Sequence, residues 1–489
     1  MHIKNVFIAN RSEIARRVIR SAHECGYSTS VAYSPQDATA LFVREADQAF
    51  ALRGNPPRES YLDIEEVLTA ARKAKADAVH PGYGFLSENA AFSDAVTEFG
   101  MKFIGPDSQA IDLLGDKTKA RALARKLGIP TPDGTATEII DSQEGIMAAR
   151  TIGYPILLKA AAGGGGKGMR LVEREQDLLA SLDRARGEAR TAFGDDRVYI
   201  EKYIVKPRHI EFQILADSHG NVIHLGEREC SIQRRHQKLI EESPSTVMTE
   251  QLRREMGEAA IALIREAHYE GAGTVEFLVG QDLKYYFLEV NTRLQVEHPV
   301  TEFVTGLDLV REQFRIAEGS KLTWTQTQVE QRGHAIEVRI QAEDVWNDFL
   351  PSLGRIAYVR HPAGAFIRND SGMFDGLEIS GYYDSLLSKL IVWDTDRALA
   401  IERMRRALDE MRVVGVSTTI PFGLFAMQNA TFRSGDFSTA FVETEFSEAV
   451  RKEESARKEM LVLPAFAAVA KHLERKSARV QFTGSPQNS

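Results

Sequence analysis

The chain has 489 residues, of which 43% are hydrophobic and 27% charged, and these values predict a globular protein of about two to four domains. The formal net charge of −8 argues against general nucleic-acid binding, and the two cysteines, Cys25 and Cys230, argue against a disulfide framework. No uncharged run approaches the roughly 20 residues of a membrane span, and the N-terminus lacks the apolar run of a signal peptide, so we expect a cytoplasmic protein.

Short strand patterns alternate with helix patterns over residues 1–115, which predicts a parallel α/β domain. The run "NVFIAN" predicts a strand and "RSEIARRVIRSAHECG" the helix after it. Asn10 and Glu13 stand at the spacing of a capping box, and Gly26 predicts the end of this helix. The first strand–helix turn has no GxGxxG, which argues against dinucleotide binding.

A linker helix capped by Asp116 is predicted over residues 116–130, followed by a small α/β domain over 131–203. Inside that domain, "KAAAGGGGKGMR" lies between the apolar runs "YPILL" and "MRLV". Consecutive glycines let backbone N–H groups approach a phosphate, and Lys159 and Lys167 add positive charge at the two ends. The loop is not a Walker loop, because Gly168 follows Lys167; a flexible linker is the alternative interpretation.

Alternating polar and apolar residues predict a strand-rich α+β domain over residues 204–449. The run "HIEFQILADSHGNVIHLGE" predicts a hairpin, "GTVEFLV" and "YYFLEVN" predict a second strand pair, and "HAIEVRIQAE" predicts another strand. Residues 450–489 predict a tail that is helical or disordered.

The run "FLEVNTRLQVEH" predicts one continuous strand that carries polar groups along a single face. These groups are Glu289, Asn291, Arg293, Gln295 and Glu297. Crowded carboxylates need a cation, and Glu276 on the neighbouring strand would complete an all-oxygen set for Mg²⁺. Arg293 and Gln295 offer donors for a small anion, and Glu297 is placed as a base. The alternative is an exposed strand covered by salt bridges.

Together these motifs resemble the biotin carboxylase component of the biotin-dependent carboxylases, in the ATP-grasp superfamily. The resemblance extends from residue 4 to about 445 and is carried by "HPGYGFLSENA", "GDK", "KAAAGGGGKGMR", "EKY", "PRHIEFQI", "SIQRRHQK", "EVNTRLQVEHPVTE" and "YYDSLLSKLIVW". It implies an ATP-grasp fold of mixed α/β and α+β class, with a Rossmann-like N-terminal domain, a mobile lid over residues 131–203 and a C-terminal α+β domain. The chain departs from the family's "NRGEIA" at Ser12, and a serine there can cap the following helix.

The resemblance also implies roles for individual residues. ATP binding is implied for Lys117, Lys159, Gly163, Gly164, Gly165, Gly166, Lys167, Gly168, Glu201, Lys202, Ile204, His209, Gln233, His236, Glu276 and Glu289. Metal binding is implied for Glu276, Glu289 and Asn291; bicarbonate binding for Lys238, Arg293, Gln295 and Val296; biotin binding for Tyr83, Gly84 and Arg339. Catalysis is implied for Glu297, Arg293, Lys238 and Arg339, with Glu297 as the base and Arg339 stabilising enolate-like biotin.

The implied reaction begins with ATP phosphorylating bicarbonate to carboxyphosphate, which yields CO2 and phosphate. The phosphate then takes a proton from biotin, and the ring nitrogen attacks CO2. The implied cofactors are Mg²⁺ or Mn²⁺ and biotin on a carrier protein, with ATP as a substrate. Because the carrier's "MKM" tripeptide does not occur here, we expect a separate carrier protein or domain, carboxyltransferase subunits and a homodimer.

The expected activity is the first half-reaction of an acetyl-CoA or propionyl-CoA carboxylase. One alternative is the same half-reaction in a pyruvate or other 2-oxo acid carboxylase. Two further alternatives are another ATP-grasp ligase and an inactive ATP-binding scaffold.

Overall fold

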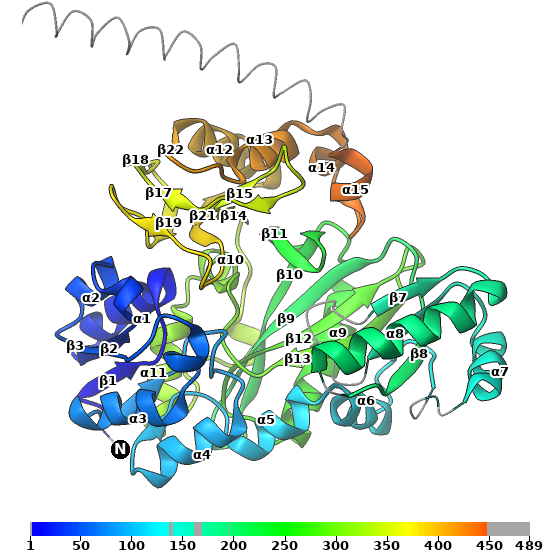
Figure 1. Ribbon diagram of the computed structural model, residues 1–489, viewed down its shortest axis with the longest axis horizontal. Coiled ribbons are helices and arrows are strands. Elements are labelled where there is room, and N and C mark those ends of the chain that lie inside the picture. Colours follow the sequence, from blue (N-terminus) through cyan, green and yellow to red (C-terminus); the bar gives the residue numbers. More distant parts are fainter. Residues whose placement is uncertain (1, 136–138, 140, 161–168, 194, 447–489) are drawn as a thin grey trace, which may run out of the picture.

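The computed structural model describes residues 2–135, 139, 141–160, 169–193 and 195–446 (Figure 1). The predicted phosphate loop at 163–168 and the predicted tail at 450–489 therefore lie outside the described residues. Among the described helices, none is both long enough and apolar enough to cross a membrane.

The N-terminal part folds around a five-stranded sheet with the order β3-β2-β1-β4-β5. All its strand pairs are parallel, which confirms the predicted parallel α/β arrangement. The strands are β1 (Asn5–Ile8), β2 (Ser28–Tyr33), β3 (Gln48–Ala51), β4 (Ala78–His80) and β5 (Lys102–Phe103). The helices are α1 (Ser12–Glu24), α2 (Leu41–Glu45), α3 (Ile64–Lys73) and α4 (Ala90–Glu98), with short 3₁₀ turns at Pro35–Asp37 and Pro57–Glu59.

The predicted capping box at the start of α1 is wrong. Arg11 occupies the cap position without a side-chain cap hydrogen bond, and Ser12 is the first helical residue. The Asn10 side chain instead donates to the carbonyl oxygens of Pro81 and Tyr83, both at 2.8 Å, and so ties the turn to the neighbouring strand end. Gly26 follows the helix with a φ of +81°, as predicted for its end.

Two helices, α5 (Ser108–Gly115) and α6 (Lys117–Lys126), connect the N-terminal part to the lid. The Asp116 carboxylate accepts from the Thr118 and Lys119 amides at 2.8 and 3.0 Å, which confirms the predicted cap. The lid sheet has the order β7-β6-β8 and is antiparallel. Its elements are α7 (Ser142–Ile152), β6 (Ile156–Ala160), β7 (Met169–Val172), a 3₁₀ turn at Glu175–Asp177, α8 (Leu178–Phe193) and β8 (Val198–Lys202).

The C-terminal part is built on an eight-stranded antiparallel sheet with the order β13-β12-β9-β10-β11-β14-β21-β19. Figure 1 shows this sheet between the N-terminal part and the lid. Its strands are β9 (Arg208–Ala216), β10 (Val222–Arg234), β11 (Gln237–Ser243), β12 (Gly271–Val279), β13 (Tyr285–Asn291), β14 (His334–Gln341), β19 (Ile367–Ser371) and β21 (Leu386–Asp394).

Within the described residues, seven helices accompany this sheet. They are α9 (Glu250–Glu266), α10 (His298–Thr305), α11 (Leu309–Ala317), α12 (Arg397–Glu410), α13 (Ile420–Gln428), α14 (Ala430–Ser434) and α15 (Phe441–Glu445). Three two-stranded ribbons pair β15 (Glu343–Asp344) with β16 (Leu350–Pro351), β17 (Gly354–Arg355) with β20 (Glu378–Ile379), and β18 (Tyr358–Arg360) with β22 (Arg412–Val414), and a 3₁₀ turn spans Gln326–Gln328.

The alternation of polar and apolar residues in the sequence corresponds to the two faces of this sheet. On β9, Phe212 packs into a core that also contains Met256 of α9 and Phe277 of β12, whereas Glu211 and Gln213 point to the other face. The predicted hairpin of β9 with β10, the β12–β13 pair and the strand at β14 are all confirmed.

The prediction of a continuous strand through Glu297 is wrong. Strand β13 ends at Asn291, residues 292–297 are irregular, and α10 begins at His298. The strand ends because its next amide finds another partner: the Thr292 N–H donates to the Glu88 carboxylate at 3.0 Å. Pro299 in the first turn of α10 then favours the start of a helix.

Ser12 has a left-handed backbone with a φ of +57°, and its hydroxyl oxygen lies 2.4 Å from where a Cβ on Gly372 would be. A non-glycine residue in this region costs roughly 1–2 kcal/mol, and no hydrogen bond of the Ser12 hydroxyl is present among the described residues to offset it. The serine therefore does not cap the helix in the way its sequence position suggested.

We expect Ser12→Gly to raise the free energy of unfolding by about 1 kcal/mol, because glycine adopts this conformation without a Cβ clash. Urea unfolding measures the change. The matched control is Arg254→Gly on the exposed face of α9, which should lower stability by about 1 kcal/mol as glycine does in an ordinary helix. Equal losses in both variants would contradict the assignment of strain at Ser12.

Candidate active site

A cavity of about 1100 Å³ is bordered by residues of the N-terminal part, the lid and the large sheet. Apart from Glu297, every predicted site residue that the structure describes lines it. They are Tyr83, Gly84, Lys117, Lys159, Glu201, Lys202, Ile204, His209, Gln233, His236, Lys238, Glu276, Glu289, Asn291, Arg293, Gln295, Val296 and Arg339. Residues more than 250 positions apart in the chain thus meet at one site.

The Lys238 ammonium lies at the centre of three buried carboxylates. Its Nζ is 2.5 Å from Glu211, 3.0 Å from Glu276 and 2.6 Å from Glu297. Burial alone would lower the pKa of Lys238, but the three carboxylates outweigh it and hold the pKa well above its ordinary value. Lys238 is therefore a permanent cation at this site.

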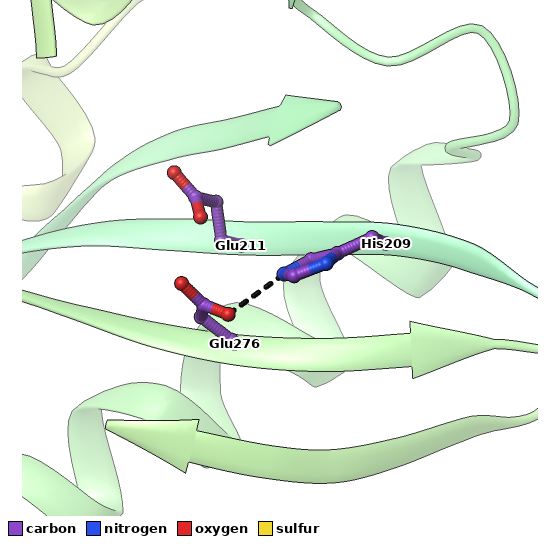
Figure 2. A group of neighbouring side chains, drawn as sticks. All are labelled: His209, Glu211 and Glu276. Atoms are coloured by element: carbon purple, nitrogen blue, oxygen red, sulfur yellow. Dashed lines mark hydrogen bonds and ion pairs between the residues drawn. The ribbon is translucent and has the colours of Figure 1, made fainter. Parts of the chain in front are cut away.

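Figure 2 shows His209, Glu211 and Glu276 converging from two neighbouring strands. The Nε2 of His209 is 2.7 Å from Glu276 Oε2, and one ligand atom of each residue lies within 4.8 Å of the others. That spacing would suit a metal ion, but Lys238 already bonds both Glu211 and Glu276. An ammonium between two carboxylates disfavours a second cation at that point.

The predicted metal set of Glu276, Glu289 and Asn291 faces the cavity instead. Glu276 and Glu289 are register partners on β12 and β13, and Asn291 Nδ2 is 2.8 Å from Glu276 Oε1. Glu289 is partly exposed and pairs with Lys117 Nζ at 2.6 Å. Two carboxylates and an amide oxygen are the oxygen ligands that Mg²⁺ prefers, and Mg²⁺ would take these oxygens in place of Lys117 at Glu289 and of Arg293 at Asn291 Oδ1.

Glu297 is fully buried and is held by a cation on each oxygen. Its Oε1 is 2.6 Å from Lys238 and its Oε2 is 2.9 Å from Arg339, which also binds Glu241 at 2.6 Å. Burial alone would raise the pKa of Glu297, but the charges of Lys238, Arg339 and Arg228 lower it below the ordinary range. Glu297 is thus an ionised carboxylate next to the cavity wall.

The irregular segment 292–297 is fixed by side chains from both sides. Glu88 of the N-terminal part binds Arg293 Nε at 2.9 Å and the Thr292 amide at 3.0 Å. Gln295 Nε2 donates to Glu276 Oε1 at 3.0 Å, and Arg293 donates to the Gln295 side-chain oxygen at 3.2 Å. These contacts, and not a continuous strand, place the donors of Arg293 and Gln295 at the cavity.

At the lid end of the cavity, the charges are largely paired. Lys159 and Arg121 both contact the buried Glu201 carboxylate, and the Lys202 ammonium donates to the carbonyl oxygens of residues 153 and 154 at 2.9 and 3.1 Å. The Lys202 ammonium is therefore hydrogen-bonded inside the lid. His236 reaches the cavity from a two-residue hairpin turn in which its φ is +64°, a strained conformation for a non-glycine residue.

Several residues that hold the site carried no predicted role. Glu88 lies in "LSENA" and Glu241 in "LIEES", and nothing local in either run indicates a partner. Glu211 and the fully buried Arg228, which bond each other at 2.5 Å, are a partial exception. Charged side chains in alternating strand runs generally need an opposite charge when they are buried, and that signal could have flagged the pair.

We predict that Glu276→Gln and Glu289→Gln each weaken divalent-cation binding in the presence of nucleotide by about tenfold or more, because each removes one carboxylate charge with little change of shape. Paramagnetic titration with Mn²⁺ measures the affinity directly. Glu258→Gln, on the exposed face of α9, is the charge-matched control and should bind Mn²⁺ normally. Unchanged affinity in both site variants would contradict the predicted ligand set.

Three family models match successive parts of the chain. They are described as biotin carboxylase, N-terminal domain, over residues 2–111; carbamoyl-phosphate synthase L chain, ATP binding domain, over 116–325; and biotin carboxylase C-terminal domain, over 337–444. The matches follow the order of the N-terminal sheet, the lid with the nucleotide end of the large sheet, and the remaining strands and helices.

Individual relatives with similar sequences belong to the same class of proteins as these family models. The chain is 51% identical over 443 residues to a biotin carboxylase of Nostoc sp., covering 91% of this chain and 99% of that protein. It is 45% identical over 503 residues to the propionyl-CoA carboxylase alpha chain of Ruegeria pomeroyi, covering 99% of this chain and 74% of that protein.

Among solved structures, the biotin carboxylase domain dimer of the 2-oxoglutarate carboxylase of Hydrogenobacter thermophilus, in complex with MgADP, ADP and bicarbonate, is similar with a TM-score of 0.88 and 45% identity. The match covers 91% of this chain and 98% of that one.

Proposed function

Because this chain belongs to the biotin carboxylase family of ATP-grasp proteins, we infer that it is a ligase that carboxylates protein-bound biotin at the expense of ATP, with bicarbonate as the carbon source and Mg²⁺ as the metal. One observation supports this activity most strongly: Glu297 is joined to both Lys238 and Arg339 at the wall of a single cavity. A carboxylate so placed can exchange a proton with a ligand on one side and release a guanidinium on the other. An inactive scaffold would not need this arrangement.

For the bicarbonate step, we propose that Arg293, Gln295 and the Val296 amide hold the anion next to Glu297. Arg293 Nη1 donates to the Gln295 side-chain oxygen at 3.2 Å, so the two side chains lie together, and the anion would compete for donors that bond Asn291 and Glu276. Glu297 is ionised and takes the bicarbonate proton onto a carboxylate oxygen. The deprotonated anion then attacks the γ-phosphorus of ATP, the bond from that phosphorus to the β–γ bridging oxygen breaks, and ADP leaves. Lys238 faces the same anion and balances its charge.

Protonation of Glu297 has a second consequence in this proposal. A neutral carboxyl group attracts Arg339 less than a carboxylate does, so the 2.9 Å contact between them weakens. Arg339 can then turn its guanidinium toward the enolate-like oxygen of biotin, which Tyr83 and Gly84 would border. The proton taken from bicarbonate and the stabilisation of biotin are thereby linked through one carboxylate.

At the nucleotide end, Glu276, Glu289 and Asn291 would hold Mg²⁺, which when bound neutralises charge on the transferring phosphoryl group. Lys117 lies 2.6 Å from Glu289 and is placed to move onto a phosphate oxygen. His209, Gln233, His236 and Ile204 border the same end of the cavity and would contact the nucleotide. Glu201 and Lys202 would mark the adenine edge, and Lys159 with loop 163–168 would cover the phosphates.

We propose an acyl-CoA such as acetyl-CoA or propionyl-CoA as the final acceptor, and a biotin carrier, carboxyltransferase subunits and a second copy of this chain as partners. The match to the Ruegeria alpha chain over 99% of this chain supports an acyl-CoA. The Hydrogenobacter protein, named as a 2-oxoglutarate carboxylase, keeps the 2-oxo acid alternative open. The cytoplasm stays the predicted location.

The acceptor is tested by isolating the native complex through this chain and supplying radiolabelled bicarbonate, ATP and one acceptor at a time. We expect label to move to an acyl-CoA and not to pyruvate or 2-oxoglutarate. Transfer to a 2-oxo acid alone would replace the acyl-CoA proposal, while labelled biotin on the carrier would still support the half-reaction.

The division of roles at Glu297 is tested by two variants. Glu297→Gln should lose bicarbonate-dependent ATP cleavage by ~10²-fold or more, because it keeps the size of the side chain but removes the basic oxygen. Arg339→Ala should retain slow ATP cleavage without biotin and lose carboxylation of biotin. Phosphate release and labelled carboxybiotin are measured separately with and without free biotin.

The controls for this pair are Glu330→Gln and Arg332→Ala, an exposed ion pair that does not line the cavity, and both should leave the two partial reactions unchanged. If Glu297→Gln carboxylates biotin at the normal rate, or if both site variants lose the same partial reactions, the proposed roles are wrong. If the unaltered protein cleaves no ATP in bicarbonate buffer, the inactive-scaffold alternative stands.

A further inference from the structure

Lys389 is the only lysine of the described chain whose whole residue is fully buried. It lies on β21, directly opposite Arg339 on β14. Its Nζ donates to the carbonyl oxygen of Val296 at 2.8 Å. Burial of an ammonium costs several kcal/mol of desolvation, and an apolar side chain could fill the same space without that cost. The lysine at this position therefore indicates a role for its charge or its N–H donors.

The same ammonium joins several parts of the cavity wall. It lies 3.5 Å from Glu13 of α1, 4.0 Å from Asp370 of β19 and 5.7 Å from the centre of the Tyr83 ring. Glu13 in turn accepts a hydrogen bond from the Tyr83 hydroxyl. Lys389 therefore connects the segment 292–297 to the N-terminal part from behind the cavity.

A second buried group fixes the peptide just before Val296. His298 Nδ1 is 2.8 Å from the carbonyl oxygen of Gln295 and must carry the hydrogen, because a carbonyl only accepts. Burial, with the nearby charges of Lys389 and Arg17, lowers the pKa of His298, so the ring is neutral. This hydrogen bond, with a longer one of 3.4 Å from the His298 backbone amide, sets the direction of the Gln295 carbonyl.

These two contacts together determine where the Val296 N–H points. In a trans peptide the C=O and N–H point in opposite directions within one plane. With the Gln295 carbonyl directed at the buried His298, the Val296 N–H of the same peptide points away from that ring. Lys389 holds the following peptide by its carbonyl, so both planes that flank Val296 are fixed.

We propose that Lys389 and His298 are positioning residues that clamp the backbone around Val296 and so aim its N–H at the anion in the bicarbonate site. The inference rests on the proposed function, because it takes Val296 as part of that site. Neither side chain needs to touch a substrate. They fix the two peptide planes next to Val296, and these planes set the direction of the N–H that faces the anion. Lys389 also contacts Glu13, which holds the Tyr83 hydroxyl.

Lys389→Met removes the donor at similar length. We expect the bicarbonate KM for ATP cleavage to rise about tenfold or more, the loss expected for a hydrogen bond from a charged donor, while the KM for ATP changes by less than about twofold. Steady-state phosphate release at varied bicarbonate and varied ATP separates the two constants. A residue that merely supported the fold would move both.

A control at a second buried position comes from Glu337, which is fully buried, has no hydrogen-bond partner among the described residues on either oxygen, and shares a sheet face with Lys389. Glu337→Gln alone should leave the bicarbonate KM within about twofold of the unaltered protein. Burial raises the pKa of Glu337 well above its ordinary value, although Lys389 opposes this rise, so Glu337→Gln replaces a neutral carboxyl group by a neutral amide. The double variant Lys389→Met with Glu337→Gln should therefore keep the raised bicarbonate KM of Lys389→Met.

His298 offers a rescue test that does not depend on how Lys389→Met folds. His298→Ala should raise the bicarbonate KM about tenfold, whereas His298→Asn places an amide N–H where Nδ1–H lies and should restore most of the loss. Unchanged bicarbonate KM in folded Lys389→Met or in His298→Ala would overturn the clamp. So would recovery of the bicarbonate KM in the double variant, or equal loss in both His298 variants. If the unaltered protein shows no bicarbonate-dependent ATP cleavage, the proposed function fails instead.

Discussion

One ammonium group among three buried carboxylates stabilises the candidate active site. Lys238 binds Glu211, Glu276 and Glu297 within 3.0 Å, and each of these carboxylates is at most 3% exposed. None of the four charges could be buried alone, because desolvation costs several kcal/mol per ion and only close pairing offsets it. The geometry of the site is therefore held by the same contacts that make its burial possible.

The large sheet makes this cluster possible because it carries apolar side chains on one face and charged side chains on the other. The apolar face of β9 and β12 packs with α9 around Phe212 and Phe277, and the opposite face carries Glu211 and Glu276. Because the two strands are paired in register, those carboxylates come side by side without any loop to position them. The N-terminal part then adds Glu88, which holds Arg293 at the other side of the cavity.

The resulting site brings groups from several elements to one cavity. Glu276, Glu289 and Asn291 line the cavity, Arg293, Gln295 and Val296 of the segment 292–297 line it as well, and Glu297 lies behind the wall against Lys238 and Arg339. Each group is held by at least one contact from another element, so small displacements are resisted in several directions. Such preorganisation favours reaction steps in which charge moves between fixed neighbours.

The sequence by itself determined what depends on local preference and on the two-residue period of strands. It predicted the Asp116 cap, the end of α1 at Gly26, the hairpin of β9 with β10 and the polar face that carries Glu276 and Glu289. The tertiary structure decided where β13 stops, because the Glu88 carboxylate that takes the Thr292 amide is 204 positions away. It also decided which charges are paired at Lys238 and what Lys389 holds. Those pairings depend on distances between remote residues, and no local pattern in the chain specifies such distances.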